Sequence, residues 1–479
     1  MSAAFTSQGA WFTSARLALT GIGMLRSIVL LSLFDPAAYG GWIAASTILL
    51  YSDQIHLGLR HVGERDLPVI LGREGEIVRE RRAQILFSQV VLVSFVVSVI
   101  LVVAATSGWT LQGLGLQELV SLGSIVVADQ AMKFVLMVQR TMRQFRKTSL
   151  WELSIEGTKS VAIIGGALVG GLTGAIVGFS IAASCSAVAI MFGERFRLSV
   201  LSETVRSLTS SLKLGFPLAV SGALLTAQMA LDRLFGTAFL SSEALGYYGV
   251  AALAAGIPIL LAQSIAVVSY PRLTTALPDD LSRISRRLLG LTAVLSLVGG
   301  ALSVHASQVL LEFWVPQYRP ASASIAILMV GTVGFGAVSP VIQILLAARK
   351  NRACVWRQTL GTALVGLILI MWGFSFPHDI AVLSVFSASG FLIMAGVVST
   401  GLRTVISPDR SDGRRAMFVF GGVMLIGLYA AAQQYLSHSM LPGPLFGTII
   451  LLVVAIGLAV AGWRLLAMPS VRLLNGELS

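Results

Sequence analysis

Continuous apolar runs of about 20 residues recur along the whole chain, and short polar segments separate them. As a helix, each run is long enough to cross a hydrocarbon core of ~30 Å. A membrane β-barrel would instead alternate apolar and polar residues over segments of about 10 residues. The pattern therefore predicts an all-α polytopic membrane protein.

The apolar runs predict fourteen transmembrane helices joined by short connections. The longest connection, 60–82, is rich in Arg and Glu, has a helical pattern and is expected to lie at the cytoplasmic interface. No connection is long enough to form a domain of its own. The predicted spans are 17–34, 40–59, 83–104, 118–139, 151–171, 173–193, 214–239, 246–270, 288–310, 321–346, 358–377, 380–402, 416–436 and 445–467.

The distribution of charge predicts the orientation. When the connections are assigned alternately to two sides, 29 of the 34 Lys and Arg fall on one side and Arg319 alone falls on the other. Positively charged loops stay in the cytoplasm, so both termini are expected to be cytoplasmic. The net charge of +12 then reflects topology and attraction to anionic lipid heads, not nucleic-acid binding.

A weak internal repeat predicts two lobes. Segments 25–45 and 232–252 each carry an Arg in one helix, a short external turn, and a Gly beside an aromatic residue at the mouth of the next helix. Gly40 and Gly246 correspond, and an interval of six spans gives the halves the same orientation. The predicted divisions are an N-lobe at 1–207, a C-lobe at 208–403 and an extension of two helices at 404–479.

Two segments resemble a known family. The first is "PAAYGGWIAASTILLYSDQIHLGL" at 36–59. The second, at 212–273, has a Pro early in a helix, an Asp–Arg late in it, then E-x-x-G-x-Y and a closing Pro-Arg. Both are similar to bacterial oligosaccharide-lipid flippases of the polysaccharide transport (Wzx-like) branch. That branch belongs to the multidrug/oligosaccharidyl-lipid/polysaccharide (MOP) exporter superfamily.

The resemblance implies a V-shaped, MATE-like fold of two six-helix lobes in the bacterial inner membrane. It also implies a substrate, undecaprenyl-pyrophosphate-linked oligosaccharide, which is flipped from the cytoplasmic to the outer leaflet for O-antigen or exopolysaccharide synthesis. The partners that the resemblance implies are membrane lipids, a polysaccharide polymerase and glycosyltransferases. Twelve helices are common in this branch, and the fourteen expected here match the lipid II flippase relatives better.

A pyrophosphate needs fixed cations when it leaves water, and four basic residues lie inside predicted spans. Lys133 follows Asp129 by four residues on one helix face, which favours a local ion pair. Lys159 follows Glu156 by three, whereas Arg26 has no acid nearby in sequence. Substrate binding and structural pairing both stay open for these cations. The candidate substrate-binding residues are Arg26, Lys133, Lys159 and Arg233.

Acidic groups and a histidine inside spans suggest coupling to H⁺ or Na⁺. Asp53 and His56 are expected on adjacent turns of one helix, although a polar patch near the headgroups would also explain them. Asp232 and Arg233 are adjacent in sequence, so Arg233 is expected to face a central cavity and Asp232 a basic partner. The candidate coupling residues are Asp53, His56, Asp129, Glu156 and Asp232.

The sequence has no phosphate-binding loop of the G-x-x-x-x-G-K-[ST] type, no H-E-x-x-H and no cluster of Cys and His. It therefore predicts no cofactor, no metal and no enzymatic activity. Two other functions remain open. One is a drug or cation antiporter of the same superfamily, which would favour an acidic, aromatic cavity. The other is a non-transporting scaffold for cell-envelope enzymes.

Overall fold

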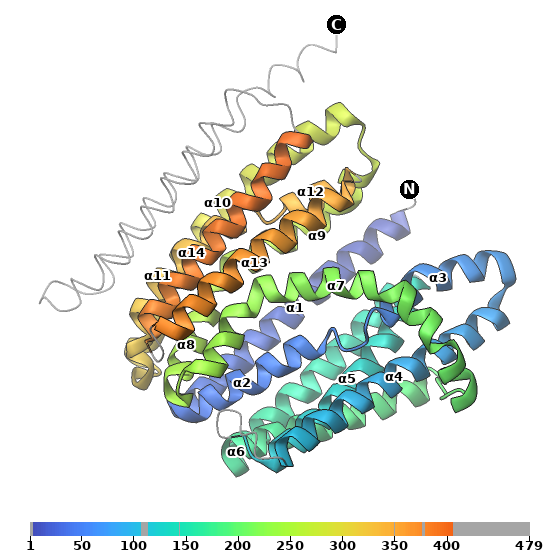
Figure 1. The fold of residues 1–479 in the computed structure, drawn as a ribbon, viewed down its shortest axis with the longest axis horizontal. Coiled ribbons are helices and arrows are strands. Elements are labelled where there is room, and N and C mark those ends of the chain that lie inside the picture. Colours follow the sequence, from blue (N-terminus) through green and yellow to red (C-terminus); the bar gives the residue numbers. More distant parts are fainter. Residues whose placement is uncertain (1–2, 107–113, 143, 349, 376–378, 406–479) are drawn as a thin grey trace, which may run out of the picture. The chain divides into compact units, whose positions relative to one another are not determined.

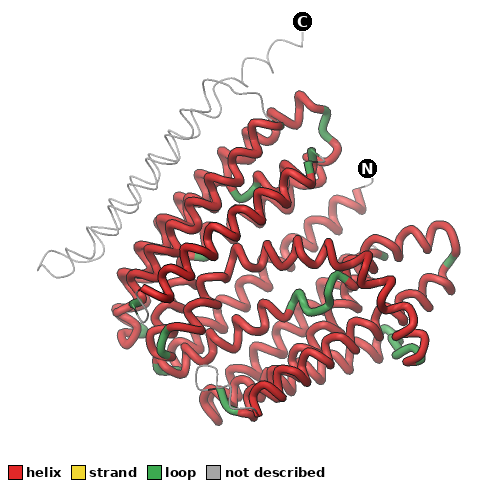
Figure 2. Tube along the Cα trace, in the orientation of Figure 1, coloured by secondary structure: helices red, strands yellow, loops and turns green. Residues whose placement is uncertain are grey.

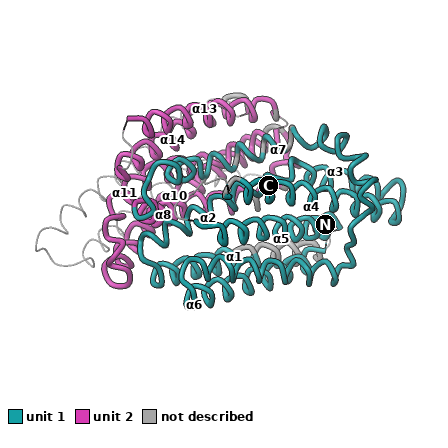
Figure 3. Tube along the Cα trace, turned by 60° about the horizontal axis from the view of Figure 1, so that its bottom comes forward, with its two compact units in different colours: residues 1–243 teal, residues 244–479 magenta. Residues whose placement is uncertain are grey.

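The computed structural model describes residues 3–106, 114–142, 144–348, 350–375 and 379–405. The described chain consists almost entirely of helices joined by short loops (Figures 1 and 2). It divides into two compact units, residues 1–243 and 244–479, which are described separately below (Figure 3). The predicted spans 416–436 and 445–467 lie outside the described residues.

Unit 1 contains seven of the described α-helices. They are α1 (Ala3–Leu33), α2 (Pro36–Ser52), α3 (Leu59–Glu74), α4 (Glu76–Thr106), α5 (Leu116–Thr141), α6 (Phe145–Gly193) and α7 (Leu201–Phe239).

In unit 2 the described helices are α8 (Ser242–Ala255), α9 (Ile257–Thr275), α10 (Pro278–Phe313), α11 (Ser322–Val338), α12 (Val341–Ala347), α13 (Asn351–Ser375) and α14 (Ile380–Ser399). Two 3₁₀ helices accompany them, η1 (Pro316–Ala321) and η2 (Thr400–Thr404). The first residue pair of α8, Ser242 and Glu243, still belongs to unit 1.

Each predicted span before residue 403 is mostly helical in the described residues, which confirms the all-α prediction. Among the described residues, eight helical segments are long and apolar enough to cross a membrane. Together with the short apolar stretch Ala18–Leu33, they account for most of the predicted spans. The count of fourteen and the orientation stay predictions.

The core of unit 1 is built around α5, which packs against both α4 and α6. The rings of Phe87, Phe134 and Phe196 meet there, with centroids 5.5–6.4 Å apart. Aromatic rings at such distances contribute beyond their buried area. Helix α1 packs on α6, and α7 packs against α2, α3 and α4.

Helix α6 is two helices in one assigned element. Its 49 residues would span about 74 Å at 1.5 Å per residue, more than twice the thickness of a bilayer core. The backbone leaves the helical conformation at Gly170 and Gly171, where Gly171 has φ 57° and ψ −138°. Gly166 then lies against Gly174, backbone to backbone. The two arms match the predicted spans 151–171 and 173–193.

Unit 2 is held by apolar packing and by hydroxyl groups. Leu273, Leu288 and Ile344 form a buried cluster. The hydroxyl of Tyr248 donates to Ser387 Oγ at 3.0 Å. Gly256 separates α8 from α9, and Pro258 stands in the first turn of α9, where its missing N–H is tolerated.

The predicted helix at 40–59 was wrong in its second half. Helix α2 ends at Ser52, residues 53–58 form turns, and α3 begins at Leu59. Gly58 has φ 84°, a conformation that glycine adopts without strain. Its backbone touches that of Gly215 on α7. Asp53 and His56 therefore lie on an irregular segment, called here the α2–α3 turn (residues 53–58).

The compact units do not end where the predicted lobes do. Helix α7 belongs to unit 1 because it packs on α2, α3 and α4. The division into lobes at 1–207 and 208–403 stays a prediction about which helices move together.

The close contact between the α2–α3 turn and α7 gives a first prediction. A Cβ on Gly215 would lie 2.7 Å from the carbonyl carbon of Gly58, and neither backbone can move aside cheaply. We expect Gly215→Ala to lower stability by about 1–3 kcal/mol, as overpacking does. Gly58→Ala should be worse because it adds a strained positive φ. The measurement is thermal unfolding of the detergent-solubilised protein.

Gly72→Ala is the matched control. A Cβ at Gly72 in α3 meets no atom within 4 Å, so this change should be neutral or stabilise by about 0.5–1 kcal/mol. Equal melting temperatures for the Gly215 and Gly72 variants would show that the turn is not clamped against α7.

Candidate functional site

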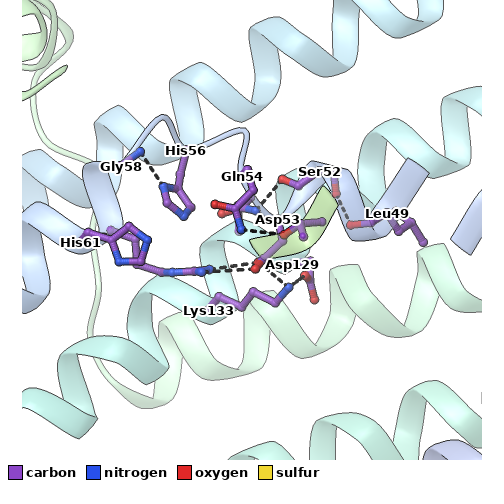
Figure 4. A network of polar contacts seen from close by, with 12 residues as sticks. Leu49, Ser52, Asp53, Gln54, His56, Gly58, His61, Asp129 and Lys133 are labelled. Atoms are coloured by element: carbon purple, nitrogen blue, oxygen red, sulfur yellow. Dashed lines mark hydrogen bonds and ion pairs between the residues drawn. The ribbon is translucent and has the colours of Figure 1, made fainter. Parts of the chain in front are cut away.

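Charged side chains in the interior of unit 1 form a continuous series, called here the charge ladder (Figure 4). Its members, in order, are Arg60, Asp53, Lys133, Asp129 and Lys159. Asp53 accepts from Arg60 at 3.2 and 3.4 Å and from Lys133 Nζ at 2.7 Å. Lys133 Nζ also lies 2.7 Å from Asp129 Oδ2, and Lys159 Nζ donates to Asp129 Oδ1 at 2.9 Å.

Four elements supply the charge ladder. Asp129 and Lys133 are one turn apart on α5, so the pair expected from the sequence is present. Lys159 reaches across from α6, and its ammonium lies 5.5 Å from the ring centroid of Phe179. Asp53 belongs to the α2–α3 turn. Because the helix is interrupted there, Arg60 in the first turn of α3 can donate hydrogen bonds to Asp53 from two nitrogens.

Arg26 has a carboxylate partner that the sequence did not reveal. Its Nη1 lies 2.6 Å from Glu156 Oε1 and 3.4 Å from Ser160 Oγ, both on α6. The side chains of Arg26 and Glu156 are 20% and 26% exposed, so the protein does not enclose the pair completely. Arg26 Nε is buried and has no hydrogen-bond partner among the described residues. The guanidinium is thus only partly satisfied.

Arg233 on α7 makes different contacts from those of Arg26. Its Nη2 donates weakly to the carbonyl of Met229 at 3.4 Å, and its Nε is buried without a hydrogen-bond partner. Among the described residues, no carboxylate lies within ion-pairing distance of Arg233. The neighbouring Asp232 is buried and accepts from the backbone N–H of Arg233 at 2.8 Å.

Two tyrosines of α2 lie in the electrostatic neighbourhood of the arginines. Tyr39, buried near the start of α2, is influenced by the charges of both Arg26 and Arg233. Tyr51, near the end of α2, is influenced by the charges of Asp232 and Arg233. The two cations that the internal repeat relates therefore both lie in the neighbourhood of α2 within unit 1.

His56 occupies the α2–α3 turn and is fully buried. Its Nδ1 accepts from the backbone N–H of Gly58 at 2.9 Å, so Nε2 carries the proton, and Nε2 has no partner among the described residues. The ring meets His61 edge-on at 5.3 Å. His61 in turn contacts Glu64 at 3.2 Å.

Glu64 lies on α3, which is not among the membrane-crossing segments. Burial acts to raise the pKa of Glu64, but the hydrogen bond with His61 and the charges of His61, Arg140 and Arg60 outweigh it and hold that pKa below its usual range. The Glu64 carboxylate is thus ionised near neutral pH.

The sequence matches a known protein family. The family described as "Polysaccharide biosynthesis protein" matches residues 68–323, more than half of the sequence. The chain belongs to this family. The match includes α4 to α7 and with them every member of the charge ladder except those on the α2–α3 turn and the first turn of α3. A search of curated proteins found no match.

Solved structures show the fold. The structure "Lipid II flippase MurJ, inward closed conformation" matches with a TM-score of 0.72 and 12% identity, over 95% of this chain and 98% of that one. An inward-facing multidrug resistance MATE family transporter of the MOP superfamily matches with a TM-score of 0.64 and 10% identity, over 82% and 98%. The eukaryotic MATE transporter AtDTX14 gives 0.55 and 12%, over 89% and 98%. The protein therefore has the fold of the MOP superfamily, as the sequence resemblance suggested.

Sequence reasoning missed several members of this site. Arg60 was assigned to a cytoplasmic loop, although it stands seven residues after Asp53 and pairs with it. Tyr39, Phe179 and Ser160 gave no signal because aromatic and hydroxyl residues are common in membrane helices. For Glu156 the sequence left open a pairing with Lys159, three residues away, and its partner in the structure is Arg26, 130 residues away.

Lys133 joins two carboxylates, which gives a second prediction. Lys133→Ala leaves Asp53 with Arg60 alone and Asp129 with Lys159 alone. Breaking a fully buried pair costs about 3–5 kcal/mol, and an exposed pair is worth at most about 1 kcal/mol. Lys133 is 38% exposed, so we expect a loss of about 1–3 kcal/mol, seen as less membrane-localised protein and a lower melting temperature.

Arg81→Ala is the control for that change. Arg81 pairs with Glu203 at 2.6 Å, but both side chains are exposed, so the loss should stay within about 0.5 kcal/mol. If Lys133→Ala and Arg81→Ala have the same melting temperature, the charge ladder does not contribute to stability.

Proposed function

We propose that the protein flips undecaprenyl-pyrophosphate-linked oligosaccharide from the cytoplasmic to the outer leaflet of the bacterial inner membrane. Two findings support this. The family is one of polysaccharide biosynthesis, and the fold is that of the MOP superfamily. A sugar pyrophosphate cannot cross hydrocarbon without losing its hydration, so a protein must supply a polar path with fixed cations. The polyprenyl tail can remain in lipid.

The observation that carries the proposal is the state of Arg233. It is a half-buried guanidinium inside the predicted span 214–239, with no ion-pairing carboxylate among the described residues and with an unsatisfied Nε. An uncompensated charge there is costly unless water or a ligand anion accompanies it. The planar fork of Arg suits phosphate oxygens, and Arg26, whose charge also influences Tyr39, would be a second donor.

The charge ladder argues against the drug or cation antiporter. A cationic drug needs a free carboxylate, whereas Asp53, Asp129 and Glu156 each hold at least one cation. Lys133 and Lys159 are also committed to these carboxylates. We therefore assign them to support of the site, with Arg233 and Arg26 as the groups that would contact phosphate.

Coupling to H⁺ or Na⁺ through Asp53, His56, Asp129, Glu156 or Asp232 remains part of the proposal. A proton or Na⁺ taken up by Asp53 or Asp129 would weaken its bond to Lys133 and loosen the link between the α2–α3 turn and α5. That link joins elements of the predicted N-lobe at 1–207, which would move against the C-lobe at 208–403 during transport. A polymerase and glycosyltransferases would act on either side of this step.

The third prediction tests Arg233. Arg233→Ala removes one charge-assisted phosphate contact, worth roughly 1.5–3 kcal/mol, or about 10- to 150-fold in affinity. We expect normal amounts of membrane-localised protein but little surface glycan in cells that carry only this variant. Arg233→Lys should restore transport partly, because an ammonium lacks the fork. The readout is surface glycan per unit of membrane-localised protein.

Arg206→Ala is the matched control, because Arg206 lies on the same helix and is exposed. It should leave the glycan level unchanged. Normal glycan with Arg233→Ala would place the phosphate site elsewhere. A non-transporting scaffold would also tolerate the loss of a single interior arginine at equal abundance.

A further inference from the structure

The contact between Arg26 and Glu156 raises a question about the proposed phosphate site. Glu156 Oε1 lies 2.6 Å from Arg26 Nη1, so one of the two candidate phosphate donors already holds an anion. A guanidinium has five N–H donors, and here Nη1 alone makes hydrogen bonds among the described residues. Arg26 is thus paired but not saturated.

Glu156 is placed so that its carboxylate can dissociate from Arg26. Its side chain is 26% exposed, so the protein does not enclose the carboxylate completely. Lys159 follows three residues later on the same face of α6 and offers a second cation nearby. By contrast, Asp129 is held by Lys133 and Lys159 together, and Asp53 by Arg60 and Lys133. Among these three interior carboxylates, Glu156 alone is held by one cation in the described contacts.

A pyrophosphate that approaches Arg26 meets Glu156 as a like charge on the same guanidinium. Like charges in contact repel strongly where water is scarce, so the two anions compete for Arg26. The exchange replaces one anion by another and leaves the arginine compensated in both states, so Arg26 is not an isolated charge within the membrane.

We propose, resting on the function proposed above, that Glu156 is a built-in counter-anion that occupies Arg26 in the empty protein and is displaced by the pyrophosphate of the substrate. Glu156 thereby sets the affinity of the site. It lowers affinity for the head group, and it re-forms its bond with Arg26 when the substrate leaves. Glu156 acts through Arg26 and makes no contact with substrate.

The experiment measures binding of undecaprenyl pyrophosphate to the full-length protein in nanodiscs, with uncharged undecaprenol as the ligand control. We expect Glu156→Gln to bind undecaprenyl pyrophosphate about fivefold more tightly than the wild type, which is about 1 kcal/mol at 1.4 kcal/mol per tenfold. Arg26→Ala should bind more weakly. In the double variant, Glu156→Gln should have no further effect, because its influence passes through Arg26.

Two further variants separate this mechanism from simpler explanations. Glu156→Asp keeps the charge but withdraws it by one methylene, so it should also tighten binding, whereas a long-range charge effect predicts no change. It also serves as the test if Glu156→Gln does not fold. Glu194→Gln removes a carboxylate at the end of the same helix, where it pairs with Lys147, and should leave the affinity unchanged.

Each outcome decides the proposal. Equal or weaker binding by well-folded Glu156→Gln and Glu156→Asp overturns it, as does a gain in affinity that persists in the Arg26→Ala background. If the wild type binds undecaprenyl pyrophosphate no better than undecaprenol, the proposed function itself fails, and the role of Glu156 fails with it.

Discussion

The interior of unit 1 depends on one constraint, that a charge in a low-dielectric membrane must have a partner. Lys133 meets this constraint for two carboxylates at once, with Asp53 and Asp129 each 2.7 Å from its ammonium. One end of this bridge is on α5 and the other on an irregular segment of backbone. The bridge therefore does more than neutralise charge. It ties the α2–α3 turn, whose backbone makes only short turn hydrogen bonds such as Gln54 N–H to Tyr51 O at 3.1 Å, to α5, which packs against both α4 and α6.

The irregular backbone in turn depends on glycine. Residues 53–58 can leave the helix because Gly58 adopts a positive φ and because Gly215 of α7 has no side chain in the way. Gln130 Nε2 satisfies the carbonyl of Ser52 at 2.9 Å, so the end of α2 is not left without a partner. The interruption between α2 and α3 then allows the side chain of Arg60 to reach Asp53. Backbone conformation and ion pairing support each other here, and neither would persist alone in hydrocarbon.

The sequence predicted helices and contacts between residues that are close in the chain, and it missed contacts between residues that are far apart in it. Apolar runs located the described helices, and the spacing of four residues located the pair of Asp129 and Lys133. The turn at 53–58 was missed because a single Gly inside an apolar run does not distinguish a break from a packed helix. The pair of Arg26 and Glu156 could not be predicted, since it joins helices whose packing is fixed by the whole unit. The family was recognised from motifs at 36–59 and 212–273, and the first of these lies entirely outside the match at 68–323.

The balance of charge suits a site that must release what it binds. The nine charged side chains of the site comprise five cations, Arg26, Arg60, Lys133, Lys159 and Arg233, and four carboxylates, Asp53, Asp129, Glu156 and Asp232. In the proposed function, one surplus cation would attract a pyrophosphate, whereas a cluster of unpaired cations would hold it too firmly, because a transport site must bind weakly enough to release. The predicted spans between 246 and 402 contain no Asp, Glu, Lys or Arg. Among the described residues, the Asp, Glu, Lys and Arg side chains within predicted spans therefore all belong to unit 1, and the described spans of unit 2 offer shape and hydroxyl groups.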